Sequence, residues 1–233
     1  MIQIVPKIYI MEGLRTSNVY ALVSPEGLTL VDSGMAGESR KIIDQLVQGD
    51  FALSDLRQIV LTHAHNDHAG SAFDIVQQSG ARVLAHRDEV PYIEQTVIVP
   101  RSLLRRFLTR LGGFLFKQPA CKVDVILADG DPVENSGGFL AVHTPGHTPG
   151  NLCLYHPERH ILLCGDALFN RHPLTGKPGL QEPPAMVTQN TAQARESIRK
   201  LAKLEVEVLL CGHGKPILEN AGQQIKNLVQ ALP

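Results

Sequence analysis

A dense group of histidine and aspartate residues lies in the segment Thr62-His63-Ala64-His65-Asn66-Asp67-His68, directly after an apolar run. Imidazole nitrogens and carboxylate oxygens are ligands that zinc, iron and manganese accept in proteins. Side chains two positions apart in an extended segment point to the same side, so His63 and His65 can reach one cation. If the chain then turns into a helix, Asp67 and His68 can face a second point nearby. A lone histidine is more often a packed or surface residue, but this run predicts a metal site.

Three further candidate ligands stand at the ends of later segments. His147 lies in a loop between two Pro-Gly pairs, and Asp166 and His213 each follow a glycine at the end of an apolar run. Taken singly, each is as readily a turn or capping residue. In α/β sheets, however, ligands gather beyond the carboxyl ends of strands. Together with the first group, these residues complete two coordination spheres.

The elements that must position these residues alternate along the chain. Strand-like runs span residues 4–11, 18–24, 28–33, 57–63, 82–86, 138–144, 151–156, 160–166 and 207–213. Helical patterns span residues 38–48, 67–79 (ending at Gly80), 191–204 and about 221–231. Both halves contain strands followed by helices, and no linker divides them. We therefore expect one α/β domain over residues 1–233, with sheets between helical layers.

Two segments depart from this alternation, an insertion at about 87–123 and a Pro- and Gly-rich loop at 168–188. Long irregular segments in compact domains are usually functional loops or lids. Within the insertion, residues 101–111 place leucines and a phenylalanine on one helical face and four arginines on the other. A helix at 101–110 has three interpretations: a surface helix packed on the core, a lid over an apolar or anionic substrate, or a contact with a membrane surface or a second subunit.

The amino-acid composition limits the kinds of molecule that the protein is expected to bind. The 233 residues include 22 basic and 23 acidic ones, a net charge of −1, which gives no overall attraction for nucleic acid or anionic membranes. We expect a small-molecule substrate, no nucleic acid and no stable membrane insertion, with a homodimer possible. The four cysteines form no CxxC pair, and Cys164 and Cys211, which lie in apolar runs, are predicted to be small buried apolar residues. No signal peptide and no apolar stretch of about 20 residues is present, which predicts a cytoplasmic protein.

The order and spacing of the candidate ligands resemble the metallo-β-lactamase superfamily over nearly the whole chain. Its HxHxDH motif is matched at residues 63–68, and its later ligands at His147, Asp166 and His213. The resemblance implies a four-layer αβ/βα sandwich with a binuclear metal site. Site one would be His63, His65 and His147; site two would be Asp67, His68 and His213; Asp166 would bridge both ions.

The resemblance also suggests residues around the ligands. Asp32 matches an early aspartate of the family and is predicted to hold a ligand histidine in the correct tautomer. The alternative is a turn carboxylate that caps the helix at 36–48. Phe169, Arg171 and His172 follow Asp166 closely enough to line a substrate pocket, although His172 could equally be an exposed loop histidine.

An all-nitrogen and oxygen ligand set suits zinc, iron or manganese, and zinc is the usual metal of the hydrolytic members. Two zinc ions per chain are expected, with iron or manganese as alternatives. Two such ions can hold a bridging hydroxide that attacks a carbonyl carbon or phosphorus. Asp67 is the candidate catalytic residue, orienting the nucleophile or carrying a proton. The di-iron electron-transfer branch has an acidic residue at the position of His65, which favours hydrolysis.

Within the superfamily, β-lactamase branches typically have cysteine or serine where this chain has Asp166. Glyoxalase II thioesterases resemble the stretch Asp166-Ala167-Leu168-Phe169 but add a C-terminal helical domain, whereas 20 residues follow His213 here. Lactonases resemble the loop at 144–150 but have tyrosine at the position of Phe169. The leading hypothesis is hydrolysis of an ester, lactone or thioester. Alternatives are a mononuclear-iron persulfide dioxygenase, a phosphodiesterase and a non-catalytic binding protein on the same fold.

Overall fold

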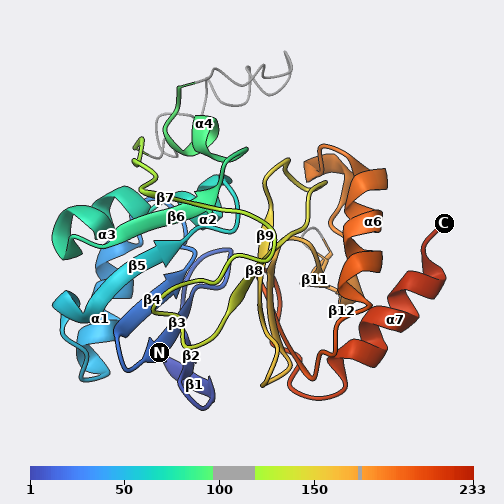
Figure 1. Ribbon diagram of the computed structural model, residues 1–233, viewed down its shortest axis with the longest axis horizontal. Helices are drawn as coiled ribbons and strands as arrows, with labels where there is room; N and C mark the ends of the chain where they lie inside the picture. Colours follow the sequence, from blue (N-terminus) through green and yellow to red (C-terminus); the bar gives the residue numbers. More distant parts are fainter. Residues whose placement is uncertain (97–118, 173–174) are drawn as a thin grey trace.

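A computed structural model of the protein describes residues 1–96, 119–172 and 175–233. Two sheets pack face to face, and helices cover the outer face of each (Figure 1). The larger sheet has the strand order β1 (Ile2–Val5), β2 (Ile8–Ile10), β3 (Tyr20–Ser24), β4 (Gly27–Val31), β5 (Leu56–Val60), β6 (Arg82–His86) and β7 (Val125–Leu127). The smaller has the order β13 (Val208–Cys211), β10 (Ile161–Gly165), β9 (Leu152–His156) and β8 (Leu140–His143).

The helices complete the layers. The larger sheet carries α1 (Ser39–Gln48) and α3 (Ala72–Ser79), and the smaller carries α6 (Thr191–Leu201) and α7 (Ala221–Ala231). The remaining described elements are short: α2 (Asn66–Ala69), α4 (Val90–Ile93), the 3-10 turns η1 (Leu53–Asp55) and η2 (Ala185–Val187), and the hairpin of β11 (Phe169–Arg171) with β12 (Pro178–Gln181). The predicted four-layer sandwich is confirmed.

The layering follows from alternation along the strands, whose successive side chains point to opposite faces. In β5, Ile59 packs toward α1 and α3, whereas Val60 packs between the sheets. In β13, Leu209 packs toward α6 and α7, whereas Leu210 packs between the sheets. Strands covered on both faces are apolar throughout, which is why these segments carry continuous runs of aliphatic residues.

Parallel pairing sets the edge at which polar residues collect. Strands β4, β5, β6 and β7 are parallel neighbours in the larger sheet, and β10 and β13 are parallel neighbours in the smaller. Their carboxyl ends therefore lie at one edge of each sheet. At that edge, backbone hydrogen bonds join the two sheets, from Leu152 N–H to Thr62 O (2.9 Å) and from Asn18 N–H to Gly212 O (2.7 Å).

Several boundaries differ from the sequence expectations. The predicted strand at 4–11 is the hairpin β1–β2, because the chain turns at Pro6 and Lys7, where Lys7 has φ 63°. The predicted helix at 67–79 is broken into α2 and α3. At the break, a Cβ on Gly70 would lie 2.3 Å from Ala36 N, so the backbones approach too closely for any other residue. Gly80 ends α3 with φ 72°, as predicted.

Three strands and a helical turn were not expected: β7, β11, β12 and α4. The predicted irregular loop at 168–188 thus contains a hairpin. The predicted helix at 101–110 lies outside the described residues. All four cysteines are buried free thiols, which confirms the prediction of burial for Cys164 and Cys211. Within the described ranges, none of the helices has the length and apolar character needed to cross a membrane.

Candidate metal centre

The seven candidate ligands come together at the edge where the parallel strands end. His63 and His65 follow β5, Asp67 and His68 lie in α2, and the other three follow β8, β10 and β13. Their donor atoms form two groups, each with all donor atoms within 4.8 Å of one another. The first group is His63, His65, His147 and Asp166, and the second is Asp67, His68 and His213.

The three imidazoles of the first group converge on one point. His65 Nδ1 lies 3.0 Å from His63 Nε2 and 3.0 Å from His147 Nε2. The three rings stand at 80°, 85° and 89° to one another, so their in-plane lone pairs meet rather than run parallel. Two nitrogens bound to one tetrahedral zinc ion are about 3.3 Å apart. The spacing of these nitrogens therefore fits a metal ion.

Asp166 faces both groups. Its Oδ2 lies 3.3 Å from His147 Nε2 and 3.4 Å from His213 Nε2, and its Oδ1 lies 3.3 Å from His68 Nε2. Burial raises the pKa of this carboxyl, but the imidazoles of His68 and His213 outweigh it and hold the pKa well below its usual value. Oδ1 is buried without a hydrogen-bond partner among the described residues. A buried anionic oxygen needs a nearby positive charge, which the protonated His68 supplies in the metal-free protein and which a metal ion would supply when bound.

Asp32 fixes the orientation of one imidazole in the second group. Its carboxylate accepts hydrogen bonds from Thr62 N–H (2.8 Å) and from the Thr62 hydroxyl (2.9 Å), and its Oδ2 lies 2.7 Å from His68 Nδ1. His68 therefore donates through Nδ1 and turns Nε2 toward the site, where a metal ion would displace the proton that Nε2 carries. The alternative expectation for Asp32 is wrong, because the residue at the N-cap of α1 is Glu38.

Burial and charge set the protonation of the imidazoles. Burial lowers the pKa of His63 well below its usual value, and the neighbouring His68 and His65 lower it further. Burial is also the main cause that lowers the pKa of His147 to about 4. Burial lowers the pKa of His68 as well, but the carboxylates of Asp166, Asp32 and Asp67 together raise it well above its usual value.

Two glycines leave room for side chains of the site, Gly212 for the Asp166 carboxylate and Gly165 for Thr62. A Cβ on Gly212 would lie 2.5 Å from Asp166 Oδ1 and 2.8 Å from His68 Cε1. Gly165 has φ 48°, and its Cβ would lie 2.8 Å from the Thr62 side chain. The glycine that precedes Asp166 and the one that precedes His213 are thus part of the site, a signal that the sequence carries in the runs CGD and CGH.

The predicted pocket residues fall into different surroundings. Phe169 is 2% exposed, and its ring stacks on that of His213 at 4.7 Å and 15°. Arg171 is exposed, and His172 is half-buried with Nδ1 accepting the Thr175 N–H at 3.2 Å. Of the three, the structure brings Phe169 into contact with a candidate ligand.

A third group of potential donors, His86, Asp88 and His143, has a different geometry. The two rings stack at 3.9 Å and 11°, so their lone pairs run parallel instead of converging. His143 Nε2 donates to the carbonyl of Pro149 at 2.9 Å. This pair therefore lacks the arrangement that marks the first group.

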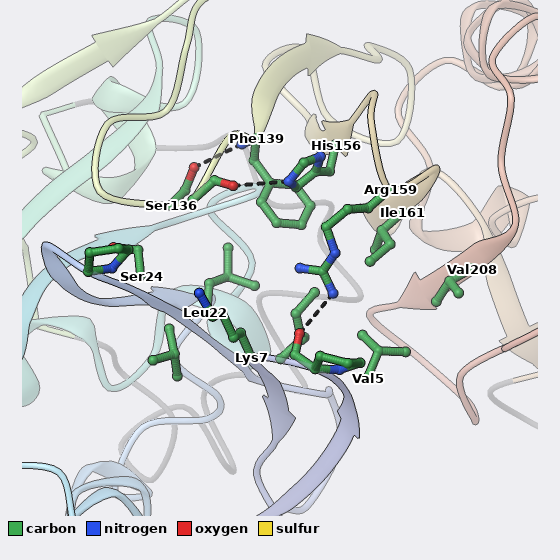
Figure 2. A pocket seen from close by; sticks show the side chains of 15 residues that line it. Val5, Lys7, Leu22, Ser24, Ser136, Phe139, His156, Arg159, Ile161 and Val208 are labelled. Carbon is green, nitrogen blue, oxygen red and sulfur yellow. Dashed lines mark hydrogen bonds between the residues drawn. The ribbon is translucent and has the colours of Figure 1, made fainter.

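A cavity of about 590 Å³ lies at the other end of the sandwich (Figure 2). Its walls include Leu22, Phe139, Ile161 and Val208, and Arg159 spans it to bond the carbonyl of Pro6 at 2.8 Å. Ile161 and Val208 are the first residues of β10 and β13, whereas the candidate ligands follow the last residues of these strands. The cavity is thus remote from the candidate metal centre.

A four-layer sandwich with two groups of imidazole and carboxylate donors at one edge has the arrangement of a metal-dependent enzyme. The chain belongs to the metallo-beta-lactamase superfamily, whose family model matches residues 13–213. The resemblance seen in the ligand motif is therefore confirmed.

Among relatives, the chain is 32% identical over 220 residues to the probable metallo-hydrolase YflN of Bacillus subtilis (strain 168), covering 88% of this chain and 83% of that one. It is 35% identical over 122 residues to a hydroxyacylglutathione hydrolase of Ectopseudomonas mendocina (strain ymp), covering 52% of this chain and 35% of that enzyme.

Two solved structures share the fold. The metallo-beta-lactamase family protein TTHA1429 from Thermus thermophilus matches with a TM-score of 0.76 and 25% identity, over 98% of this chain and 80% of that one. TTHA1623, solved in a di-iron-bound form, matches with a TM-score of 0.69 and 25% identity, over 96% of this chain and 98% of that one.

Proposed function

We propose that the chain is a binuclear zinc hydrolase that cleaves a small ester, lactone or thioester. The observation that carries this proposal is the position of Asp166, whose two carboxylate oxygens face the two ligand groups at 3.3 Å each. His63, His65 and His147 would hold one ion, and Asp67, His68 and His213 the other. Asp166 would bind both.

When bound, a pair of divalent ions supplies a water molecule of lowered pKa and an electrophile for the oxygen of the scissile group. The residues of the chain orient the ligands of these ions. Asp32 and Thr62 fix the tautomer of His68, and the Phe169 ring holds His213 in place by stacking. The site thereby keeps its geometry while the substrate reacts.

Asp67 is the candidate proton carrier. Its side chain is 27% exposed, in contrast to the buried Asp166, and its Oδ2 lies 3.4 Å from His213 Nε2. One oxygen thus faces the second group, while the carboxylate keeps contact with solvent. We infer that Asp67 takes the proton of the attacking water and returns it to the leaving group.

Zinc is proposed from the donor set, because nitrogen and oxygen donors in a converging arrangement suit it. The same donors suit iron, which TTHA1623 holds as a di-iron pair. A mononuclear-iron dioxygenase would have no use for the second group, and the convergence of Asp67, His68 and His213 therefore favours the hydrolase.

The substrate class is proposed from the relatives and from the charge of the chain. Similarity to hydroxyacylglutathione hydrolase over 122 residues favours a thioester, although the match covers 35% of that enzyme. The near-neutral charge favours a small molecule over nucleic acid.

The location proposed for the protein is the cytoplasm, because four free thiols suit a reducing compartment.

A substrate panel with matched variants tests the proposal. The zinc-loaded protein is offered a p-nitrophenyl ester, a lactone, a thioester, a phosphodiester and a β-lactam. We expect turnover of one of the first three, abolished in His65→Ala and Asp166→Ala and retained in His86→Ala, which alters the stacked pair outside the centre. Unchanged turnover in either ligand variant, or cleavage of the phosphodiester alone, would contradict the proposal.

A further inference from the structure

A buried glutamate lies beside the candidate metal centre and was not expected from the sequence. Glu89 is 0% exposed and lies directly before α4, at the start of the insertion. Its Oε2 accepts the Ala64 N–H and its Oε1 accepts the Gly150 N–H, both at 2.8 Å. Both carboxylate oxygens are therefore used, each by a different loop.

The two loops joined in this way carry the imidazoles of the first group. Ala64 lies between His63 and His65, after a strand of the larger sheet. Gly150 closes the loop that carries His147, between two strands of the smaller sheet. One carboxylate thus spans the interface between the sheets at the level where the three nitrogens must converge.

The packing around Gly150 leaves space that the Glu89 side chain fills. A Cβ on Gly150 would lie 2.8 Å from Glu89 Cγ and 3.0 Å from Glu89 Oε1. The glycine therefore admits the glutamate. Burying a carboxylate costs free energy unless its oxygens are hydrogen-bonded, and here two backbone N–H groups supply the compensation. An amide in its place would turn an NH₂ group toward one of these donors.

We propose that Glu89 is a positioning residue that sets the distance between His147 and the pair His63 and His65. By this distance it controls the metal affinity of the first group. The proposal rests on the metal centre proposed above. Substitution of a residue that orients a metal ligand typically weakens metal binding by about 10–100-fold.

The test compares two glutamates of one segment. Glu94 is half-buried, and its Oε1 accepts the Val123 N–H at 3.0 Å, a single backbone contact that touches neither ligand loop. Metal-free wild type, Glu89→Gln and Glu94→Gln are titrated with Zn²⁺ against a chelating dye. We expect about 10–100-fold weaker binding at one site in Glu89→Gln and a change under about threefold in Glu94→Gln.

Two further measurements separate positioning from general destabilisation. The absorption spectrum of bound Co²⁺ reports the geometry of its ligands, and we expect it to change in Glu89→Gln and not in Glu94→Gln. Gly150→Ala disturbs the same contact from the other side and should weaken binding in the same direction, which decides the question if Glu89→Gln does not fold. Wild-type affinity and spectrum in both Glu89→Gln and Gly150→Ala would overturn the proposal. Absence of metal binding by the wild type would instead refute the proposed function.

Discussion

Replacing Asp32 by asparagine removes a charge beside His68 without changing the shape of the side chain. Asparagine tolerates the positive backbone angle of this position, φ 65°, so the turn can persist. Its oxygen can still accept the Thr62 N–H, but its NH₂ group then faces His68 Nδ1. His68 must move its proton to Nε2 to accept from that group, and Nε2 is the atom that faces the second group.

The magnitude follows from the lost contact. A hydrogen bond to a charged group contributes about 1.5–3 kcal/mol, and about 1.4 kcal/mol corresponds to tenfold in an equilibrium constant. We therefore expect Asp32→Asn to weaken metal binding at the second group by about 10–100-fold. The first group should change less, because Asp32 reaches it only indirectly, through the Thr62 hydroxyl that lies 3.1 Å from His63 Nδ1.

The assay is a Zn²⁺ titration of metal-free protein against a chelating dye, read as two binding steps. Ser33→Ala is the matched control, because Ser33 is fully buried and its hydroxyl donates to the backbone carbonyl of His68 at 2.8 Å rather than to the ring. The control should lose about 1 kcal/mol of stability and keep both steps. Two unchanged steps in Asp32→Asn, or equal losses in both variants, would refute the tautomer argument.

Two further predictions concern packing and pH. Gly212→Ala should reduce hydrolysis by about 100-fold or more, because its Cβ would meet Asp166 Oδ1 at 2.5 Å and displace it. The control is Gly80→Ala, whose Cβ would have no neighbour within 4 Å; it should lower stability and leave activity unchanged. Full activity of Gly212→Ala would contradict the geometry. In the metal-free protein, His147 has its pKa lowered from 6.5 to about 4, so the unfolded chain binds a proton first as the pH falls. As the pH is lowered from 6.5 to about 4, the free energy of unfolding should therefore fall by about 3 kcal/mol more in the wild type than in His147→Gln. Urea denaturation at a series of pH values measures this difference. If the free energy of unfolding depends on pH in the same way in both proteins, the assigned shift in the pKa of His147 is excluded.

The clustering of the candidate ligands was predictable because most of them closely follow a strand whose apolar run is visible in the sequence. His63, Asp166 and His213 come shortly after β5, β10 and β13, and parallel strands bring such ends to one edge. The resemblance to a family added how these residues divide into two groups. By distance, the structure places the donor atoms of Asp67, His68 and His213 in one group, and it places Asp166 with the other three histidines.

Residues that act through distant contacts were not predictable. Glu89 lies 25 residues from Ala64 and 61 from Gly150, and nothing in its local pattern marks those partners. The break of the predicted helix beside Gly70 also coincides with a contact distant in the sequence, the close approach of the Ala36 backbone. The hairpin β11–β12 contains exposed residues such as Pro178 and Gly179, and its strands exist through pairing rather than through apolar alternation.

The central claim is that the two ligand groups hold two metal ions that hydrolysis requires. The most direct test measures metal content and hydrolysis on the same sample, purified without added metal, then treated with chelator and reloaded with zinc. We predict about two zinc ions per chain, loss of hydrolysis on chelation and recovery with zinc. One iron per chain with oxygen consumption on a persulfide, or hydrolysis that survives removal of the metal, would contradict the account.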